Sequence, residues 1–257
     1  MTVRDYLLSL KGKTAAVLGI GVSNTPLIAL LCENGIRTIA CDRKSREALG
    51  ACAAELASMG AELRLGEGYL DDLDADVIFR TPGMRSDVPA LAAAREKGSV
   101  ITSEMEVFFE VCPCTIIGVT GSDGKTTTAS IIAEILRAAG KTVWLGGNIG
   151  HPLLCDAAKM KESDLVVVEL SSFQLLDMKR SPHIAVVTNL APNHLDWHTD
   201  MAEYVAAKKN IFLHQGKNDI LRLKADNEAS APFLKEAKGE VRFFSRRTRT
   251  ENGAFLD

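Results

Sequence analysis

The chain has 257 residues, of which 46% are hydrophobic and 25% charged, and its formal net charge is −3. This length allows two hydrophobic cores, and the balanced charge excludes a basic surface for nucleic acid. The one concentrated positive run, residues 246–249, is interpreted as a solvated turn between strands. No apolar stretch is long enough to span a bilayer, and the six cysteines lack the spacing of disulfides or a zinc site. We therefore expect a cytoplasmic, monomeric protein with free thiols.

The first part of the chain alternates short apolar strands with helices. Two strands end in Gly19 and Asp42, and two helices stop before Gly35 and Gly60. The predicted strands cover residues 14–19, 37–41, 76–79 and 99–102, and the predicted helices cover 26–34, 45–59 and 88–97. This alternation predicts a parallel sheet with helices on both faces.

The pattern restarts after Cys112. Strands are predicted at residues 115–119, 142–145, 165–168 and 184–188, with a helix over 126–139. Residues 253–257 are predicted to be the middle of a strand hairpin. The chain is therefore predicted to be an α/β protein of two domains that join near residue 111.

The clearest motif is the loop 118–128, Gly-Val-Thr-Gly-Ser-Asp-Gly-Lys-Thr-Thr-Thr, between a strand and a helix. Glycines let backbone N–H groups converge on phosphate oxygens, and the helix N-terminus favours an anion. Lys125 is expected to reach the β- and γ-phosphates, and the Thr126 hydroxyl to ligate Mg²⁺. Val119 stands where the standard motif has its first glycine. We expect ATP or GTP to contact Gly121, Ser122, Asp123, Gly124, Lys125, Thr126 and Thr127.

Four more stretches follow in order. They are Gly-Gly-Asn-Ile-Gly at 146–150, Glu-Leu-Ser-Ser-Phe-Gln-Leu at 169–175, Asn-His-Leu-Asp at 193–196 and Tyr-Val-Ala-Ala-Lys at 204–208. Glu169 ends an apolar strand, where a carboxylate can ligate Mg²⁺. A GTPase would need an Asn-Lys-x-Asp motif, and residues 188–192 supply only its asparagine.

The phosphate loop resembles that of the Mur ligases and the folylpolyglutamate synthetases, which also lack the first glycine. With the other motifs in the same order, the resemblance to the Mur ligase family covers essentially all 257 residues. The 169–175 string resembles the branch that adds D-glutamate. This implies an ATP-dependent, ADP-forming ligase of peptidoglycan precursor synthesis. It would join UDP-N-acetylmuramoyl-L-alanine to D-glutamate through an acyl phosphate.

The resemblance also implies roles for individual residues. Its catalytic set is Lys125, Glu169, His194 and Lys208. Two Mg²⁺ ions are expected on Thr126, Glu169, His194 and Lys208, with Lys208 carbamylated into an anion. Asn148, Ser171 and His194 are expected to contact the UDP-linked substrate.

The N-terminal part carries Gly19-Ile-Gly21, followed by Asn24 where a dinucleotide fingerprint has its third glycine. Asp42 ends the next strand about twenty residues later, like a ribose-binding acid. Alone, this incomplete fingerprint suggests NAD; beside the ligase motifs it suggests UDP. The expected substrate contacts are Gly21, Val22, Ser23, Asn24, Thr25, Asp42, Arg43 and Thr81, the last in a Thr-Pro-Gly turn.

These motifs predict a Rossmann-like, UDP-substrate-binding domain over residues 1–111. A P-loop ATPase domain is predicted over 112–257 and is expected to be incomplete at its C-terminus. The amino-acid-binding domain of the family is expected to be absent, so the chain alone is expected to turn over little. Two alternatives stay open: a Mur ligase with another amino-acid substrate, or a module that binds a UDP-sugar or nucleotide without turnover.

Overall fold

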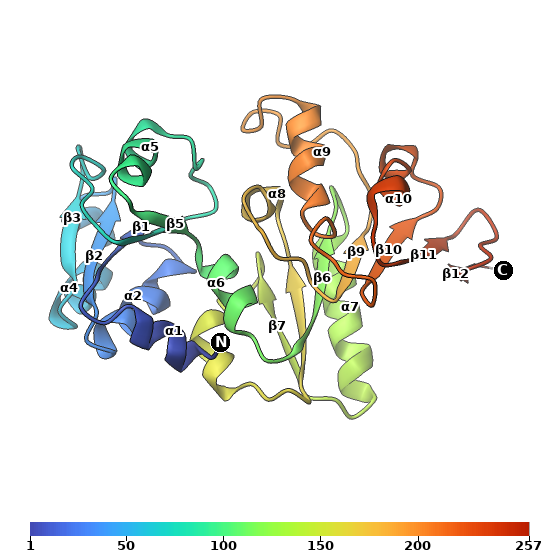
Figure 1. Cartoon of the computed structure of the whole chain (residues 1–257), viewed down its shortest axis with the longest axis horizontal. Helices are drawn as coiled ribbons and strands as arrows, with labels where there is room; N and C mark the ends of the chain where they lie inside the picture. The colour runs from blue at the N-terminus through green and yellow to red at the C-terminus, as the bar shows by residue number, and fades with distance from the viewer. Residues whose placement is uncertain (257) are drawn as a thin grey trace. The chain divides into compact units, whose positions relative to one another are not determined.

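The computed structural model describes residues 1–256 and contains two sheets whose paired strands all run parallel. The chain divides into two compact units (Figure 1). Unit 1 comprises Met1–Cys112 with His151–Lys159, and unit 2 comprises Pro113–Gly150 and the residues from Met160 onward. The predicted α/β class with parallel sheets is confirmed.

Unit 1 holds a five-stranded sheet of order β3-β2-β1-β4-β5. The strands are β1 (Thr14–Leu18), β2 (Arg37–Asp42), β3 (Glu62–Leu65), β4 (Val77–Arg80) and β5 (Val100–Thr102). The helices are α1 (Val3–Ser9), α2 (Asn24–Glu33), α3 (Arg46–Leu49), α4 (Ala51–Ser58), α5 (Pro89–Glu96) and α6 (Glu104–Val111). The central strands β1 and β4 are almost wholly buried, as expected for parallel strands covered on both faces.

Several local features of unit 1 differ from the sequence prediction, and helices α1 and α6 were not predicted. The helix predicted over 45–59 is broken at Gly50, whose φ of 54° and ψ of −130° are not helical, giving α3 and α4. The edge strand β3 was not predicted, because its residues are only half buried and lack a continuous apolar run.

A segment from later in the chain also packs with unit 1. It contains the 3₁₀-helix η1 (Leu154–Lys159). The buried Glu104 carboxylate at the start of α6 accepts the Leu154 N–H at 2.8 Å. Burial raises the pKa of Glu104 to about 7, although its hydrogen bonds to this segment oppose the shift. The sequence placed these residues in the second domain, because nothing local marks a contact so distant along the chain.

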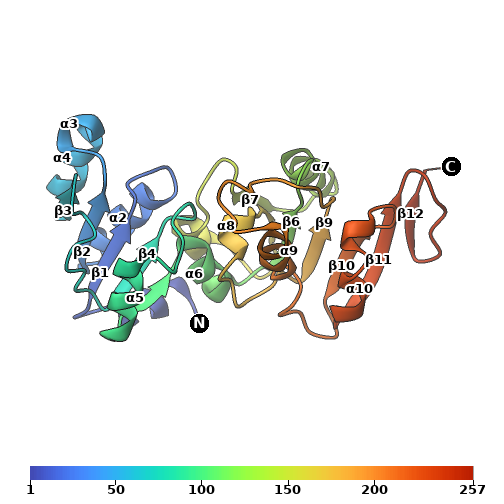
Figure 2. The same ribbon diagram turned by 90° about the horizontal axis from the view of Figure 1, so that it is seen from above.

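Unit 2 holds a seven-stranded sheet of order β12-β11-β10-β9-β6-β8-β7. The strands are β6 (Thr115–Thr120), β7 (Val143–Gly147), β8 (Leu165–Glu169), β9 (Ile184–Val187), β10 (Ile220–Lys224), β11 (Glu240–Ser245) and β12 (Gly253–Phe255). The helices are α7 (Lys125–Ala138), α8 (Ser172–Leu175), α9 (Met201–Lys209) and α10 (Phe233–Glu236), with η2 (Glu228–Ser230). Helix α7 packs on β6, β7 and β8 (Figure 2).

The end of the described chain corrects one prediction. Strand β12 pairs parallel with β11, with Gly253 opposite Phe243, so residues 253–256 are not in a hairpin. The basic residues 246–249 lie exposed between these two strands, which confirms the predicted solvated turn. All six cysteines are free thiols. Within residues 1–256, no helix combines the length and the apolar character needed to cross a membrane.

Strand order decides where the chemistry of unit 2 can lie. Strand β6 is central and neighbours both β8 and β9. The carboxyl ends of parallel strands meet at one edge of a sheet, which is where α/β proteins bind ligands. The glycine-rich loop after β6, Glu169 at the end of β8 and the segment after β9 therefore meet at this edge.

Candidate functional site

Two glycines shape the loop between β6 and α7. Gly121 has a φ of 150°, and a Cβ built on it would lie 1.8 Å from Thr188 Oγ1. Gly124 has a φ of 75° and immediately precedes α7. Side chains at either position would be strained, and at Gly121 also obstructed, so both glycines are required by geometry.

The polar side chains of the loop are held by the segment that follows β9. Ser122 Oγ donates to Ala191 O at 2.8 Å and accepts the Ala191 N–H at 2.9 Å. The Asp123 N–H donates to Asn189 Oδ1 at 2.9 Å. Ser122 and Asp123 thus stabilise the loop, and their predicted contact with a nucleotide stays a prediction. Asn189, which sequence reasoning discounted as part of a guanine motif, serves this loop instead.

Two other motifs contact the Glu169 carboxylate, which is 1% exposed. Thr126 Oγ1 donates to Glu169 Oε2 at 2.6 Å, and Asn148 Nδ2 donates to Glu169 Oε1 at 2.8 Å. Lys125 Nζ donates to Ser122 O at 2.9 Å, within the same loop. The structure therefore brings together four predicted site residues, Lys125, Thr126, Asn148 and Glu169.

Gly147 lies directly against the Glu169 backbone. Its φ is 97°, and a Cβ built there would approach Glu169 O to 2.3 Å. The Asn148 N–H also donates to Glu169 O at 2.8 Å. The glycines of the 146–150 motif thus allow a backbone approach that presents Asn148 to the carboxylate.

Gly147→Ala is expected to lower the free energy of unfolding by about 3 kcal/mol, because it combines a left-handed conformation with an obstructed Cβ. Gly140→Ala is the matched control: its φ is 76°, and within residues 1–256 a Cβ built there would meet nothing within 4 Å. It should cost about 1 kcal/mol from conformation alone. Urea unfolding of both variants measures the difference; equal losses would contradict the close approach.

Lys208 is buried on the same side of the loop, at 1% exposure. Its Nζ donates to Gly121 O at 2.9 Å and to Thr120 Oγ1 at 3.2 Å, and lies 4.8 Å from the Tyr204 ring centroid. Burial, reinforced by the positive charge of Lys125, lowers the pKa of Lys208 to about 7. The neutral form of this amine is therefore favoured more strongly than in an exposed lysine.

His194 stands apart from this hydrogen-bonded set. It is exposed, has a φ of 54°, and its ring packs edge-on against Phe173 at 5.0 Å between centroids. A non-glycine residue in this conformation is uncommon and is often found at functional sites. Among residues 1–256, no three His, Cys, Asp or Glu side chains gather into a metal-binding cluster. The role of His194 as a ligand stays a prediction.

The Ser171 side chain stabilises the start of helix α8. Its hydroxyl accepts the Gln174 N–H at 3.2 Å, and Gln174 Oε1 accepts the Ser171 N–H at 3.0 Å. This reciprocal pair is a capping box that starts α8. Sequence reasoning assigned Ser171 to substrate and gave no role to Tyr204 or His198. Tyr204 OH lies 2.8 Å from Ser122 Oγ, and His198 is 2% exposed.

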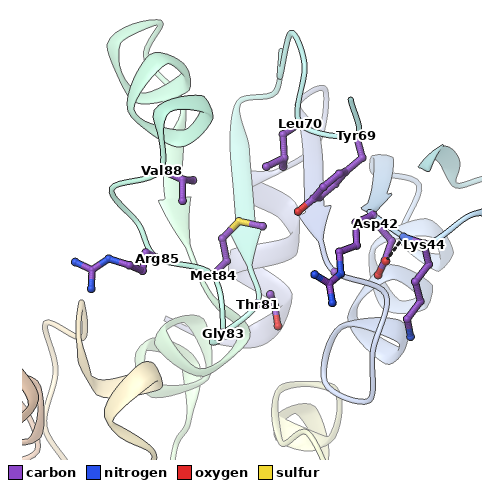
Figure 3. Close-up of a pocket in the computed structure, with 11 residues that line it drawn as sticks. Asp42, Lys44, Tyr69, Leu70, Thr81, Gly83, Met84, Arg85 and Val88 are labelled. Carbon is purple, nitrogen blue, oxygen red and sulfur yellow. Dashed lines mark hydrogen bonds between the residues drawn. The ribbon is translucent and has the colours of Figure 1, made fainter. Parts of the chain in front are cut away.

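Unit 1 has its own pocket at the carboxyl ends of its strands, with a volume of about 580 Å³ (Figure 3). Asp42 lines it with its carboxylate held by the Ile20 N–H at 2.6 Å and the Lys44 N–H at 2.8 Å. The lining combines charged and apolar side chains: Gly19, Asp42, Arg43, Lys44, Tyr69, Leu70, Thr81, Gly83, Met84, Arg85 and Val88. The structure thus brings the predicted residues Asp42, Arg43 and Thr81 to one cavity.

The predicted residues Gly21 to Thr25 lie outside this lining in the part of the chain that the structure describes. Asn24 is 2% exposed and donates to Leu18 O at 3.0 Å and Gly19 O at 3.1 Å. Asn24 stands where a dinucleotide fingerprint has its third glycine, and its two hydrogen bonds fix the turn after β1. Its side chain is therefore a support of the loop, and contact of residues 21–25 with substrate stays a prediction.

A glycine-rich loop between a central parallel strand and a helix, with a hydroxyl and a carboxylate beside it, defines a P-loop nucleotide-binding unit. Residues 119–255 match the family model of the Mur ligase middle domain. The chain belongs to the Mur ligase family.

Curated relatives agree with this assignment. The UDP-N-acetylmuramoylalanine–D-glutamate ligase of Clostridium novyi (strain NT) is 52% identical over 257 residues, covering 100% of this chain and 56% of the relative. The enzyme of the same name from Acetivibrio thermocellus is 52% identical over 255 residues, covering 99% and 55%. The chain therefore spans about half the length of the curated relatives it matches.

Solved structures support the fold. The UDP-N-acetylmuramate:L-alanyl-gamma-D-glutamyl-meso-diaminopimelate ligase from Neisseria meningitides aligns with a TM-score of 0.61 at 19% identity, covering 93% of this chain and 82% of that one. The UDP-N-acetylmuramate-alanine ligase from Thermotoga maritima aligns with a TM-score of 0.53 at 21% identity, covering 92% and 53%.

Proposed function

We propose that this chain carries the UDP-substrate and ATP sites of a ligase that joins D-glutamate to UDP-N-acetylmuramoyl-L-alanine. The observation that carries this proposal is the convergence of Thr126 and Asn148 on the buried Glu169 carboxylate, beside the phosphate loop. The two relatives at 52% identity bear the name of that reaction. Unit 2 would hold ATP and unit 1 would hold the UDP group.

Mg²⁺ suits the oxygen donors at this edge of the sheet. The Thr126 hydroxyl and the Glu169 carboxylate lie 2.6 Å apart, and Mg²⁺ typically takes one or two protein oxygens together with phosphates and water. These two residues would hold the first ion. When bound, it would neutralise charge on the transferring phosphoryl group.

A second ion would need another anionic donor, and Lys208 supports one. Its neutral amine, favoured by burial that lowers its pKa to about 7, can add to carbon dioxide and form a carbamate. This modification would convert a cation into an anion beside the loop. His194 would complete the second site.

The proposed reaction has two steps. The substrate carboxylate attacks the γ-phosphorus of ATP, which forms an acyl phosphate and releases ADP. The amine of D-glutamate then attacks the acyl carbon through a tetrahedral intermediate, and phosphate leaves. Lys125, at the start of α7, would stabilise negative charge on the phosphoryl oxygens in the first step.

The pocket of unit 1 supports binding of a UDP group. Arg43 and Lys44 would supply positive charge for a diphosphate. Tyr69 and Met84 would offer apolar surface for a base (Figure 3). Asp42 would accept hydrogen bonds from the ribose or uracil in addition to those that it accepts from the Ile20 and Lys44 N–H groups.

Amino-acid selectivity tests the D-glutamate proposal. The experiment extends the chain after Asp257 with the remaining part of the Clostridium novyi relative and measures ADP release with each amino acid. With UDP-N-acetylmuramoyl-L-alanine and Mg-ATP, D-glutamate is expected to support release at least about 100-fold faster than L-glutamate, L-lysine or L-alanine. The 257-residue chain alone serves as the reference. Preference for another amino acid would assign the chain to a different branch of the family.

A further inference from the structure

His198 is a buried histidine with both ring nitrogens paired. Its Nδ1 lies 3.1 Å from Glu203 Oε2, and its Nε2 lies 2.9 Å from Ser172 Oγ. An ionised carboxylate only accepts hydrogen bonds, so the ring proton belongs on Nδ1. Nε2 lies within hydrogen-bond distance of the Ser172 hydroxyl, so the imidazole links Ser172 to Glu203.

Aromatic rings enclose this imidazole. Phe173 stacks on it at 5.7 Å between centroids with an interplanar angle of 22°. Trp197 and Tyr204 meet it edge-on, at 4.8 Å and 5.4 Å. The ring therefore has little freedom to rotate, and the distance between its two hydrogen-bond partners is fixed by the rigid imidazole.

The two partners belong to elements that carry the candidate site. Ser172 begins α8 and follows Glu169 by three residues. Glu203 lies in α9, which also supplies Tyr204 and Lys208. Tyr204 contacts the phosphate loop at Ser122 Oγ, and Lys208 contacts it at Gly121 O. His198 thus ties the turn after Glu169 to the helix that carries Lys208.

Serine, histidine and a carboxylate in this order also occur in hydrolases, but access excludes that use here. Ser172 is 1% exposed and His198 is 2% exposed. A nucleophile must reach its substrate carbonyl, and the folded chain leaves no room for one at Ser172. Because its polar groups are buried and hydrogen-bonded to one another, the Ser172–His198–Glu203 network can position the elements that it joins.

We propose that His198 is a positioning residue, which holds α9 through Ser172 and Glu203 so that Lys208 Nζ stays against Gly121 O and Thr120 Oγ1. This inference rests on the proposed function, in which Lys208 forms a carbamate and holds a second metal ion. The hydrogen-bond chain and the placement of Lys208 can be tested without any ligase turnover, so the two can fail separately.

The test uses the 257-residue chain and the variants Ser172→Ala and Glu203→Ala, which remove one hydrogen bond to His198 each and leave the imidazole in place. The first readout is ¹⁵N NMR of histidine-labelled protein. The wild type is expected to show a proton on His198 Nδ1 at pH 7. A proton on Nε2 instead would overturn the proposed chain.

The second readout is the rate at pH 7 at which dilute acetic anhydride acylates Lys208, followed by mass spectrometry in bicarbonate-free buffer. Each variant is expected to raise the rate at pH 7 on the order of fivefold to tenfold, which corresponds to one lost hydrogen bond. His214→Ala, which changes an exposed histidine of the same unit, should leave the rate unchanged.

Thermal unfolding separates positioning from general stability. If Ser172→Ala and Glu203→Ala lower the melting temperature while the acylation rate of Lys208 remains at its wild-type value, the Ser172–His198–Glu203 network only stabilises the fold and the proposal is wrong. Raised Lys208 reactivity in folded variants that still bind UDP supports it. Loss of nucleotide binding by the wild-type chain would instead count against the proposed function.

Discussion

Lys125→Ala is expected to weaken ATP binding by the 257-residue chain by roughly 100-fold or more. The substitution removes the positive charge at the first residue of α7, beside the phosphate loop. The binding of UDP-N-acetylmuramoyl-L-alanine should stay nearly unchanged. Its proposed pocket is lined entirely by residues of unit 1 and shares none with the loop. Calorimetric titration with each ligand measures both affinities.

Lys141→Ala is the matched control for this variant. Lys141 is exposed just beyond the other end of α7, so its removal changes the net charge by the same amount without touching the loop. It should leave both affinities at wild-type values. Equal losses of ATP and UDP-substrate binding in Lys125→Ala would contradict the division of labour between the units.

Lys208→Met is expected to make the chain more stable than the wild type at pH 6, by roughly 1–3 kcal/mol. The buried ammonium of Lys208 is costly, and this cost is why its pKa falls to about 7 from the usual 10.5. Methionine fills a similar volume without a charge. The gain is reduced by the two hydrogen bonds that Lys208 makes to the loop.

The sign of the pH dependence follows from linkage. Between pH 7 and 10.5, the unfolded chain holds a proton on Lys208 that the folded chain has released, so wild-type stability rises with pH in this window. The advantage of the methionine variant should therefore be full below pH 7 and shrink toward pH 10. Urea unfolding in bicarbonate-free buffer measures it; an advantage that does not change with pH would refute the buried-amine interpretation.

Sequence patterns predicted the parts of this structure that are continuous along the chain. The central strands were predicted within a few residues, because fully buried parallel strands are apolar throughout. The start of α7 was predicted because the phosphate loop before it needs glycines at positions where a side chain would be strained. Strands β10 and β11 were not predicted. Their faces are only partly buried, so their apolar residues alternate with charged ones.

The candidate site divides in the same way. The motifs placed Thr126 and Glu169 in one region, and the order of parallel strands explains why they meet. Asn148 was expected on the UDP-linked substrate, and its hydrogen bond to Glu169 was not predicted. The side-chain tasks of Ser171 and Asn24 were not predictable, because a capping box and an internal turn support use the same residue types as ligand binding. His198 was missed because its partners lie on two other segments.

The measurement that tests the central claim most directly is calorimetric titration of the 257-residue chain with UDP-N-acetylmuramoyl-L-alanine, with NAD as the comparison ligand. Both share a diphosphate, so the comparison isolates recognition of the uridine and sugar-linked groups. We expect saturable binding of the UDP compound and none of NAD. Saturable binding of NAD alone would show that unit 1 is a dinucleotide-binding domain, and would contradict the proposed ligase substrate.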